Sequence, residues 1–380
     1  EIKVNNSKCK IFNDTINVVN SKINILDSDL IFEGEIHNLF NNILVDSTKI
    51  IQIIGDLTST TFNLKSLISN NDKKNDVAQE YYMPSIFNLD LKTSINSLAY
   101  NNIYPNQVNG RLIYKDKAVS TKNLSMNLLG GKMLFDGKFY KNSENNFKLT
   151  GNIKLENIDV KRTFGAFNNF GQDFIMAKHI KGISSSNIIC NITFNKFLEI
   201  NLDKINIDSK VSIEKGELID FKPLESLSNY VKLDDLAHIK FSKLENEIKI
   251  KDKIISIPNM EIKSSALSLI ISGKHFFNQE YNYKISLLLS DLLAKRFRKK
   301  GNNFNTQDST NLLKTNLQLR MIGDKENSDI SFEKLKIKEN LKNEIKKEIL
   351  DVKKIISEEI NKKEAVEDDE ELEIEWDDNF

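Results

Sequence analysis

Alternation of apolar and polar residues is the feature that most constrains this chain. Along residues 147–155 every second side chain is apolar or glycine, and those between are polar. Successive side chains of a β-strand point to opposite faces of a sheet, so this period predicts a half-buried strand. Long versions recur in 281–289 and 313–321, and shorter ones in 23–25, 30–32, 124–128, 200–202, 205–207, 248–250, 255–257 and 267–271. One apolar and one polar face is typical of antiparallel sheets with a wet side. The chain is therefore expected to be mainly β.

Glycine recurs inside the expected strands with an apolar residue two positions before and after it. The glycines concerned are Gly34, Gly55, Gly110, Gly137, Gly151 and, in part, Gly273. Glycine weakens a strand, so its recurrence favours a bend, a bulge or a close approach of two backbones. Uneven spacing disfavours a solenoid of fixed period. We expect a long, twisted, mostly antiparallel sheet that curls into a taco-like β-groove. Scattered strand glycines with no common role are the alternative.

Three segments show a helical period. Residues 160–178 carry a stripe of phenylalanines, and two internal glycines predict a short or broken helix. Residues 224–237 follow Pro223, which suits a first helical turn. Residues 333–363 predict a long amphipathic helix with alternating charge. We expect its apolar face to cover an edge or open end of the sheet. A coiled-coil arm that recruits a partner is the alternative.

The segments suggest an order along the chain. The expected units are an N-terminal β repeat at 1–83 with a polar loop at 69–80, a second repeat at 84–180, a C-terminal β region at 181–332, the helix at 333–363 and an acidic tail at 364–380. No stretch approaches the roughly 20 apolar residues of a membrane-spanning helix. Because Glu1 already lies within an expected strand, we expect a fragment whose N-terminal part is missing.

Residues that could carry chemistry are sparse. Lys+Arg and Asp+Glu both number 54, so net charge gives no case for nucleic acid. Two cysteines far apart, Cys9 and Cys190, exclude a CxxC-type zinc site but leave a single bridge open. The 4 histidines are isolated in sequence, and each is expected at the surface or a strand edge. No nucleophile–base or metal pattern appears. We expect no enzyme activity, cofactor or metal.

A resemblance to a known family enters in the second half of the chain. The segments that carry it are 211–228, 233–246, 257–267, 271–276 and 289–295, with weaker support from Met83-Pro84, 108–110, 124–131, 135–137 and 168–172. Together they resemble the C-terminal region and preceding β repeats of AsmA-family proteins. The likeness spans about Pro84 to Lys338 and rests on structural residues.

The resemblance implies a periplasmic protein anchored in the inner membrane of a double-membrane cell envelope by an N-terminal helix absent here. It also implies kinship with bridge-like lipid transfer proteins, and hence phospholipid transport between the membranes and outer-membrane maintenance. No motif residue carries over as a known lipid ligand. Phospholipid acyl chains, the membrane and envelope proteins are the implied partners.

Apart from the resemblance, the strand pattern alone leaves an apolar sheet face that must be covered, because three helices are too few to bury it. Our candidates for lining a lipid groove are Phe147, Leu149, Ile153, Leu155, Leu267, Leu269, Ile271, Tyr283, Ile285, Leu287 and Leu289. A basic cluster follows the last of these strands and suits anionic headgroups, or else is a solvated strand end: Lys295, Arg296, Arg298, Lys299 and Lys300. A filled core predicts the same alternation. The alternative function is then a structural β scaffold that binds envelope proteins without a groove.

Overall fold

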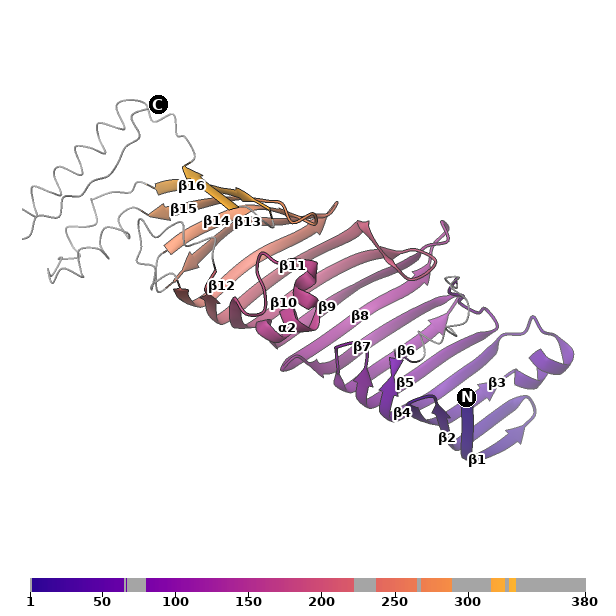
Figure 1. Cartoon of the computed structure of the whole chain (residues 1–380). Helices are drawn as coiled ribbons and strands as arrows, with labels where there is room; N and C mark the ends of the chain where they lie inside the picture. Colours follow the sequence, from indigo (N-terminus) through magenta and orange to yellow (C-terminus); the bar gives the residue numbers. More distant parts are fainter. Residues whose placement is uncertain are drawn as a thin grey trace, which may run out of the picture.

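The computed structural model describes residues 2–64, 66, 80–221, 237–264, 268–288, 316–324 and 328–332. Seventeen strands of these residues form one long curled sheet, in which each strand pairs with its neighbours in chain order (Figure 1). The strands are β1 Ile2–Phe12, β2 Thr15–Ile25, β3 Ser28–His37, β4 Ile51–Asn63, β5 Phe87–Ala99, β6 Asn106–Lys115, β7 Ala118–Leu128, β8 Gly131–Lys141, β9 Phe147–Asp159, β10 Ile180–Phe194, β11 Ile200–Ile219, β12 His238–Lys251, β13 Ile254–Lys263, β14 Ser268–Phe276, β15 Tyr281–Leu288, β16 Asn316–Gly323 and β17 Ser328–Phe332. The mainly β, mostly antiparallel fold expected from the alternation is confirmed.

One pair of strands departs from the antiparallel rule. Strands β4 and β5 run parallel, with Ile51 beside Phe87 at one end and Asn63 beside Ala99 at the other. A parallel pair needs a connection that returns to the starting edge of the sheet, which a hairpin turn cannot provide. The β4–β5 pair joins the units expected at 1–83 and 84–180 by hydrogen bonds between strands. In the same way, the β9–β10 pair joins the units expected at 84–180 and 181–332.

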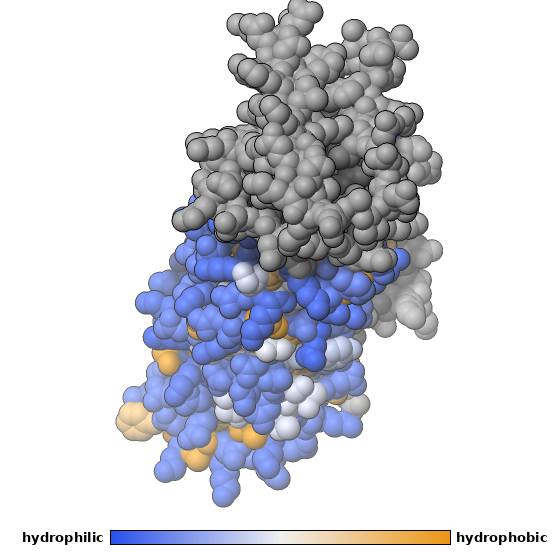
Figure 2. Space-filling model, turned by 90° about the vertical axis from the view of Figure 1, so that its left-hand side faces the viewer, coloured by the Kyte–Doolittle hydropathy of each residue, from blue (hydrophilic) through white to orange (hydrophobic). Residues whose placement is uncertain are grey.

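Register gathers the apolar side chains on one face, which we call the inner face. A row that crosses β8 to β11 shows it: Phe139 pairs with Leu149, Leu149 with Ile192 and Ile192 with Ile205. The residues between these point to the outer face, where Lys148, Asn152 and Lys154 lie on β9. Where the described residues are visible in Figure 2, their surface is mostly hydrophilic, with hydrophobic residues in small separate patches.

Paired glycines allow the sheet to curl toward its inner face. Gly34 lies opposite Gly55, and Gly137 lies opposite Gly151. A Cβ atom added to Gly151 would sit 2.9 Å from the Cα of Gly137 and 2.7 Å from the backbone oxygen of Asp136. Such approaches leave no room for a side chain, so the recurrent glycines have the common role that a curled sheet requires.

Three clusters of buried residues occupy the inner face. The first joins β2, β3 and β5 through Val18, Phe32 and Leu91, and the second joins β5, β6 and β7 through Ile95, Val108 and Met126. The third and largest cluster holds Phe221, Ile239, Leu269, Tyr281, Tyr283, Ile285, Leu319 and Met321. The first and third clusters combine strands that are not all direct neighbours, whereas the second lies on the consecutive strands β5, β6 and β7.

Helical structure is brief in the described part of the chain. The helix expected at 160–178 is broken: α2 spans Val160–Ala166 and a 3-10 turn, η2, spans Asn168–Gly171. The α-helix begins where the Asp159 carboxylate accepts the Arg162 backbone N–H, and it ends where residues 168–171 take positive φ. A π-helical turn, η1, at Asn41–Val45 was not expected. The expected helix at 333–363 and the tail at 364–380 lie outside the described residues, as does 224–237 apart from Ala237.

Candidate functional site: the central trough of the inner face

The inner face between the second and third clusters differs from the two clusters beside it. Many of the apolar side chains that β8 to β12 place on it belong to none of the clusters and are half-buried, whereas Phe147, Cys190 and Ile205 on the same face are buried. We call this stretch the central trough; its members are Phe135, Phe139, Leu149, Ile153, Leu155, Ile188, Ile192, Ile207, Ile213, Leu244 and Ile248. A filled core would bury such residues almost completely. The central trough thus presents hydrocarbon along several neighbouring strands without sealing it from solvent.

The C-terminal side of the trough is closed by a segment that folds inward. Residues 172–179 follow η2, and we call them the plug. Its Phe174 ring lies 4.4 Å from the Tyr281 ring, 5.1 Å from Phe221 and 5.8 Å from Tyr283, measured between centroids. Phe174 and Ile175 thereby pack against the third cluster. The plug thus covers the inner face there with the Phe174 ring and the Ile175 side chain.

Hydrogen bonds hold the plug in this conformation. The Gln172 side chain bonds to both the N–H and the C=O of Ile175, and the Asn169 side chain accepts the Ala177 N–H at 2.9 Å. At the far end, the Ile219 N–H donates to the His179 carbonyl at 2.8 Å. These bonds satisfy backbone groups that would otherwise be buried without partners, so the plug has a defined place.

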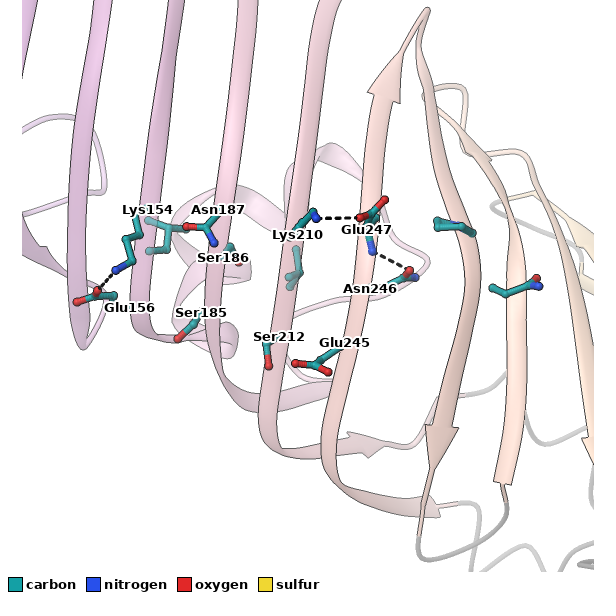
Figure 3. Close-up of a pocket in the computed structure, with 14 residues that line it drawn as sticks. Lys154, Glu156, Ser185, Ser186, Asn187, Lys210, Ser212, Glu245, Asn246 and Glu247 are labelled. Carbon is teal, nitrogen blue, oxygen red and sulfur yellow. Dashed lines mark hydrogen bonds and ion pairs between the residues drawn. The ribbon is translucent and has the colours of Figure 1, made fainter.

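A seam in the sheet borders the trough. Strands β12 and β13 pair continuously at only three positions, from Lys249–Ser256 to Lys251–Ile254, and an isolated bridge joins the two segments again at Phe241–Ser264. Between these pairings the two strands separate, beside Glu247 and Asn246 (Figure 3). A depression of about 750 Å³ lies here, reaching from Lys154 on β9 to Pro258 on β13. Proline has no N–H to donate to a ladder, which fits its place at this divergence.

Polar side chains interrupt the apolar inner face at the seam. Ser186 is buried, and Val211 separates it from Asn246 across the strands. The Nδ2 atom of Asn246 is buried and has no hydrogen-bond partner among the described residues. Such a donor is costly to leave unpaired.

Charges near the trough lie on the outer face and neutralise one another. Lys210 pairs with Glu247 at 3.3 Å and Lys154 with Glu156 at 2.7 Å, and Figure 3 draws both pairs. A hydrogen bond from Lys154 holds the pKa of the Glu156 carboxyl below its usual value. Exposed pairs of this kind contribute little to stability. No group of three or more His, Cys, Asp or Glu suited to a metal occurs within the described ranges.

The groove candidates from the sequence fall into three sets. Leu149, Ile153 and Leu155 lie in the central trough, and Ile271 is half-buried against the third cluster. Phe147, Leu269, Tyr283 and Ile285 are buried, with exposed fractions of 1%, 5%, 6% and 0%. Leu287 lies in β15 opposite Leu269, but its side chain, like Leu267, Leu289, Lys295, Arg296, Arg298, Lys299 and Lys300, lies outside the described part.

Sequence reasoning missed the plug and the polar seam. Phe174 was assigned to a helical stripe, although Gly171 and Gln172 already interrupt that period. Ser186 and Asn246 could have been found as polar residues at positions where the alternation calls for apolar ones. Three of the four histidines are not buried, but the surface expectation is wrong for His275, which is 6% exposed. Cys9 is exposed and Cys190 buried, and both are free thiols.

Comparisons with known proteins identify no relative of this chain. No family model, curated protein or solved structure matches this chain. Among the helices in the described ranges, none has the length and apolar character needed to cross a membrane. The central trough and its two flanking clusters are therefore the observations from which function has to be argued.

Proposed function

We propose that this chain is a non-enzymatic cell-envelope protein whose central trough binds the acyl chains of phospholipids. In keeping with the AsmA-like sequence pattern, its place would be the periplasm, with an inner-membrane anchor in the full-length protein. Its task would be to pass phospholipid toward the outer membrane and so support outer-membrane biogenesis. The observation that supports this most is the half-buried apolar stretch from β8 to β12.

The physical argument concerns what a half-buried apolar surface gains from a guest. Each methylene removed from water is stabilised by about 0.8 kcal/mol, so an acyl chain needs no specific polar contact to bind such a surface. Contiguous apolar area open to solvent is otherwise an aggregation hazard. Inner-face hydrocarbon that runs across neighbouring strands suits a flexible chain that slides, and the polar outer face suits an aqueous compartment.

Photo-crosslinking in cells tests the proposal directly. A benzophenone amino acid is placed at Leu149, in the trough, and at Asn152, which is exposed on the outer face of the same strand. Phospholipid captured at 149 and absent at 152 is the expected result. Equal capture at both positions, or none at 149 in abundant folded protein, would refute the groove.

A second candidate function rests on the third cluster. Ile285 and Leu319 are almost fully buried there, and the plug packs against them as a filled core would. This favours a rigid β scaffold for envelope proteins, at least from β14 to β16. The crosslinking experiment separates the two, because a scaffold captures proteins at outer-face positions such as 152 and no lipid at 149.

A further inference from the structure

Large apolar side chains gather in the open at the N-terminal end of the sheet. They lie at the end of β1 and in the loop between β3 and β4, which includes η1. We call this set the apolar tip: Phe12, Phe40, Ile43, Leu44, Val45 and Ile50. Leu44 and Val45 are 76% and 78% exposed, and Phe12 is 73% exposed. In Figure 1 the coiled ribbon of η1 projects beyond the strand ends next to β3.

The tip has a defined conformation that exposes hydrocarbon. The Asp14 carboxylate accepts the backbone N–H groups of Phe40 at 3.0 Å and Asn41 at 3.1 Å. The Asn38 side chain donates to the Ile50 carbonyl at 3.1 Å, and Asp46 accepts the Thr48 N–H at 3.0 Å. Because these polar groups bond within the loop, the side chains that remain to meet a partner are aliphatic and aromatic.

Charges of both signs lie around the tip, but they are directed differently. Lys10 is exposed, and Lys49 lies near enough to Asp46 to help the Thr48 hydrogen bonds lower the pKa of the Asp46 carboxyl. The nearby acids Asp14 and Asp46 are instead engaged by groups of the loop itself. With these carboxylates turned toward the loop, apolar residues beside the long side chains of Lys10 and Lys49 complement the interface of an anionic bilayer, where hydrocarbon enters and ammonium groups meet headgroups.

The inner face begins close to the tip. Ile16 pairs with Ile36, and Ile36 pairs with Ile53, which forms an apolar row across β2, β3 and β4. This row lies one or two residues inside the strand ends that border the tip.

We propose that the apolar tip inserts into the interfacial layer of a membrane that contains anionic lipid. A protein partner would call for a rim of polar groups free to bond across an interface, whereas the tip bonds its own polar groups internally. The proposal goes beyond lipid binding in the trough and does not depend on it, because it rests on the exposure and charge of residues 12 and 38–50.

Vesicle co-sedimentation of the full chain tests the tip. The vesicles are phosphatidylcholine alone or mixed with phosphatidylglycerol. Leu44→Asp is compared with Ile189→Asp, a matched change at an outer-face residue of β10 that is 62% exposed. We expect binding to mixed vesicles, weakened on the order of tenfold by Leu44→Asp and unchanged by Ile189→Asp. No binding by the unaltered chain, or equal binding by both variants, would overturn the proposal.

Two further measurements establish how the tip binds. In a Cys9→Ser background, Leu44→Cys carries a polarity-sensitive fluorophore whose emission should shift to the blue on mixed vesicles. Binding without this shift would contradict insertion. Lys10→Glu combined with Lys49→Glu should remove the preference for phosphatidylglycerol, and a preserved preference would contradict the charge argument.

Two controls separate the tip from other sites. If light scattering without vesicles finds a dimer that Leu44→Asp dissociates, the occupant is a second copy and the membrane proposal fails. Ile153→Asp, in the trough, should leave vesicle binding intact. The experiments therefore distinguish an error in the proposal for the trough from an error in the proposal for the tip.

Discussion

At the scale of single residues, His275 makes stability depend on pH. Its ring is buried among Phe174, Tyr281 and Tyr283, and its Nε2 atom has no partner among the described residues. Burial lowers the pKa of His275 below its ordinary 6.5. The unfolded chain then takes up the proton at a higher pH than the folded chain does. The contribution is complete above about pH 6.5 and is lost as the pH falls through that value.

We therefore expect the melting temperature to fall between about pH 7.5 and 5.5, a range in which ordinary carboxylates stay ionised. His275→Phe keeps a ring in the cluster and should flatten this dependence. Circular dichroism melts of both proteins measure the effect, and an unchanged slope in His275→Phe would contradict it.

A second residue-scale prediction concerns the curl. Gly151→Ala places a methyl group against the backbone of β8 and the ring of Phe135. We expect a loss of about 1–3 kcal/mol of unfolding free energy, as for other overpacked sites. Gly165→Ala is the matched control, because nothing lies within 4 Å of its added Cβ. Alanine there should be neutral or stabilise α2 by up to about 1 kcal/mol. Equal effects in denaturant titrations would contradict a glycine-dependent curl.

At the scale of elements, the plug decides which part of the inner face is filled. Phe174→Ala removes the ring that joins α2 and η2 to β15, and because Phe174 is half-buried we expect a cost of about 2 kcal/mol. Amide exchange in β14, β15 and β16 should then become faster. Phe170→Ala removes a ring that is 57% exposed and should leave these strands unchanged. Identical exchange in both variants would mean that the plug does not stabilise this part of the sheet.

At the scale of the whole molecule, the sheet is a long path interrupted by filled segments. With neighbouring strands about 4.8 Å apart, seventeen strands extend for roughly 75–80 Å. An acyl chain that moves along this path has to cross the central trough. A charge in the trough should therefore stop transfer without unfolding the protein, because water already reaches that surface.

Ile153→Asp and Ile285→Asp separate an open trough from a filled core. Ile153 is half-buried in the trough, whereas Ile285 is fully buried in the third cluster. We expect Ile153→Asp to fold normally and to abolish lipid transfer between donor and acceptor vesicles. Ile285→Asp should cost several kcal/mol and unfold its region. Asn152→Asp is the control for charge alone. If Ile153→Asp unfolds the protein as Ile285→Asp does, the trough is a filled core.

The sequence alone determined the features that depend on near neighbours along the chain. A period of two fixes which side chains of a strand share a face, so the β class and the apolar identity of Phe147, Leu149 and Ile153 followed directly. The strand glycines indicated curling, because a glycine inside a strand favours a bend, a bulge or a close approach of two backbones. Gly165 and Gly171 predicted that residues 160–178 would not form one unbroken helix, and α2 ends at Ala166.

Only the tertiary structure decided how far each apolar residue is covered. Leu149 and Ile285 have the same alternating surroundings in sequence, yet one is half-buried and the other is fully buried. The difference comes from the plug, which lies more than a hundred residues before Ile285, and from the local curl of the sheet. The parallel β4–β5 pair and the apolar tip could not be predicted from the sequence either. Periodicity fixes the direction of a side chain, whereas its burial depends on segments that the curl of the sheet brings near it.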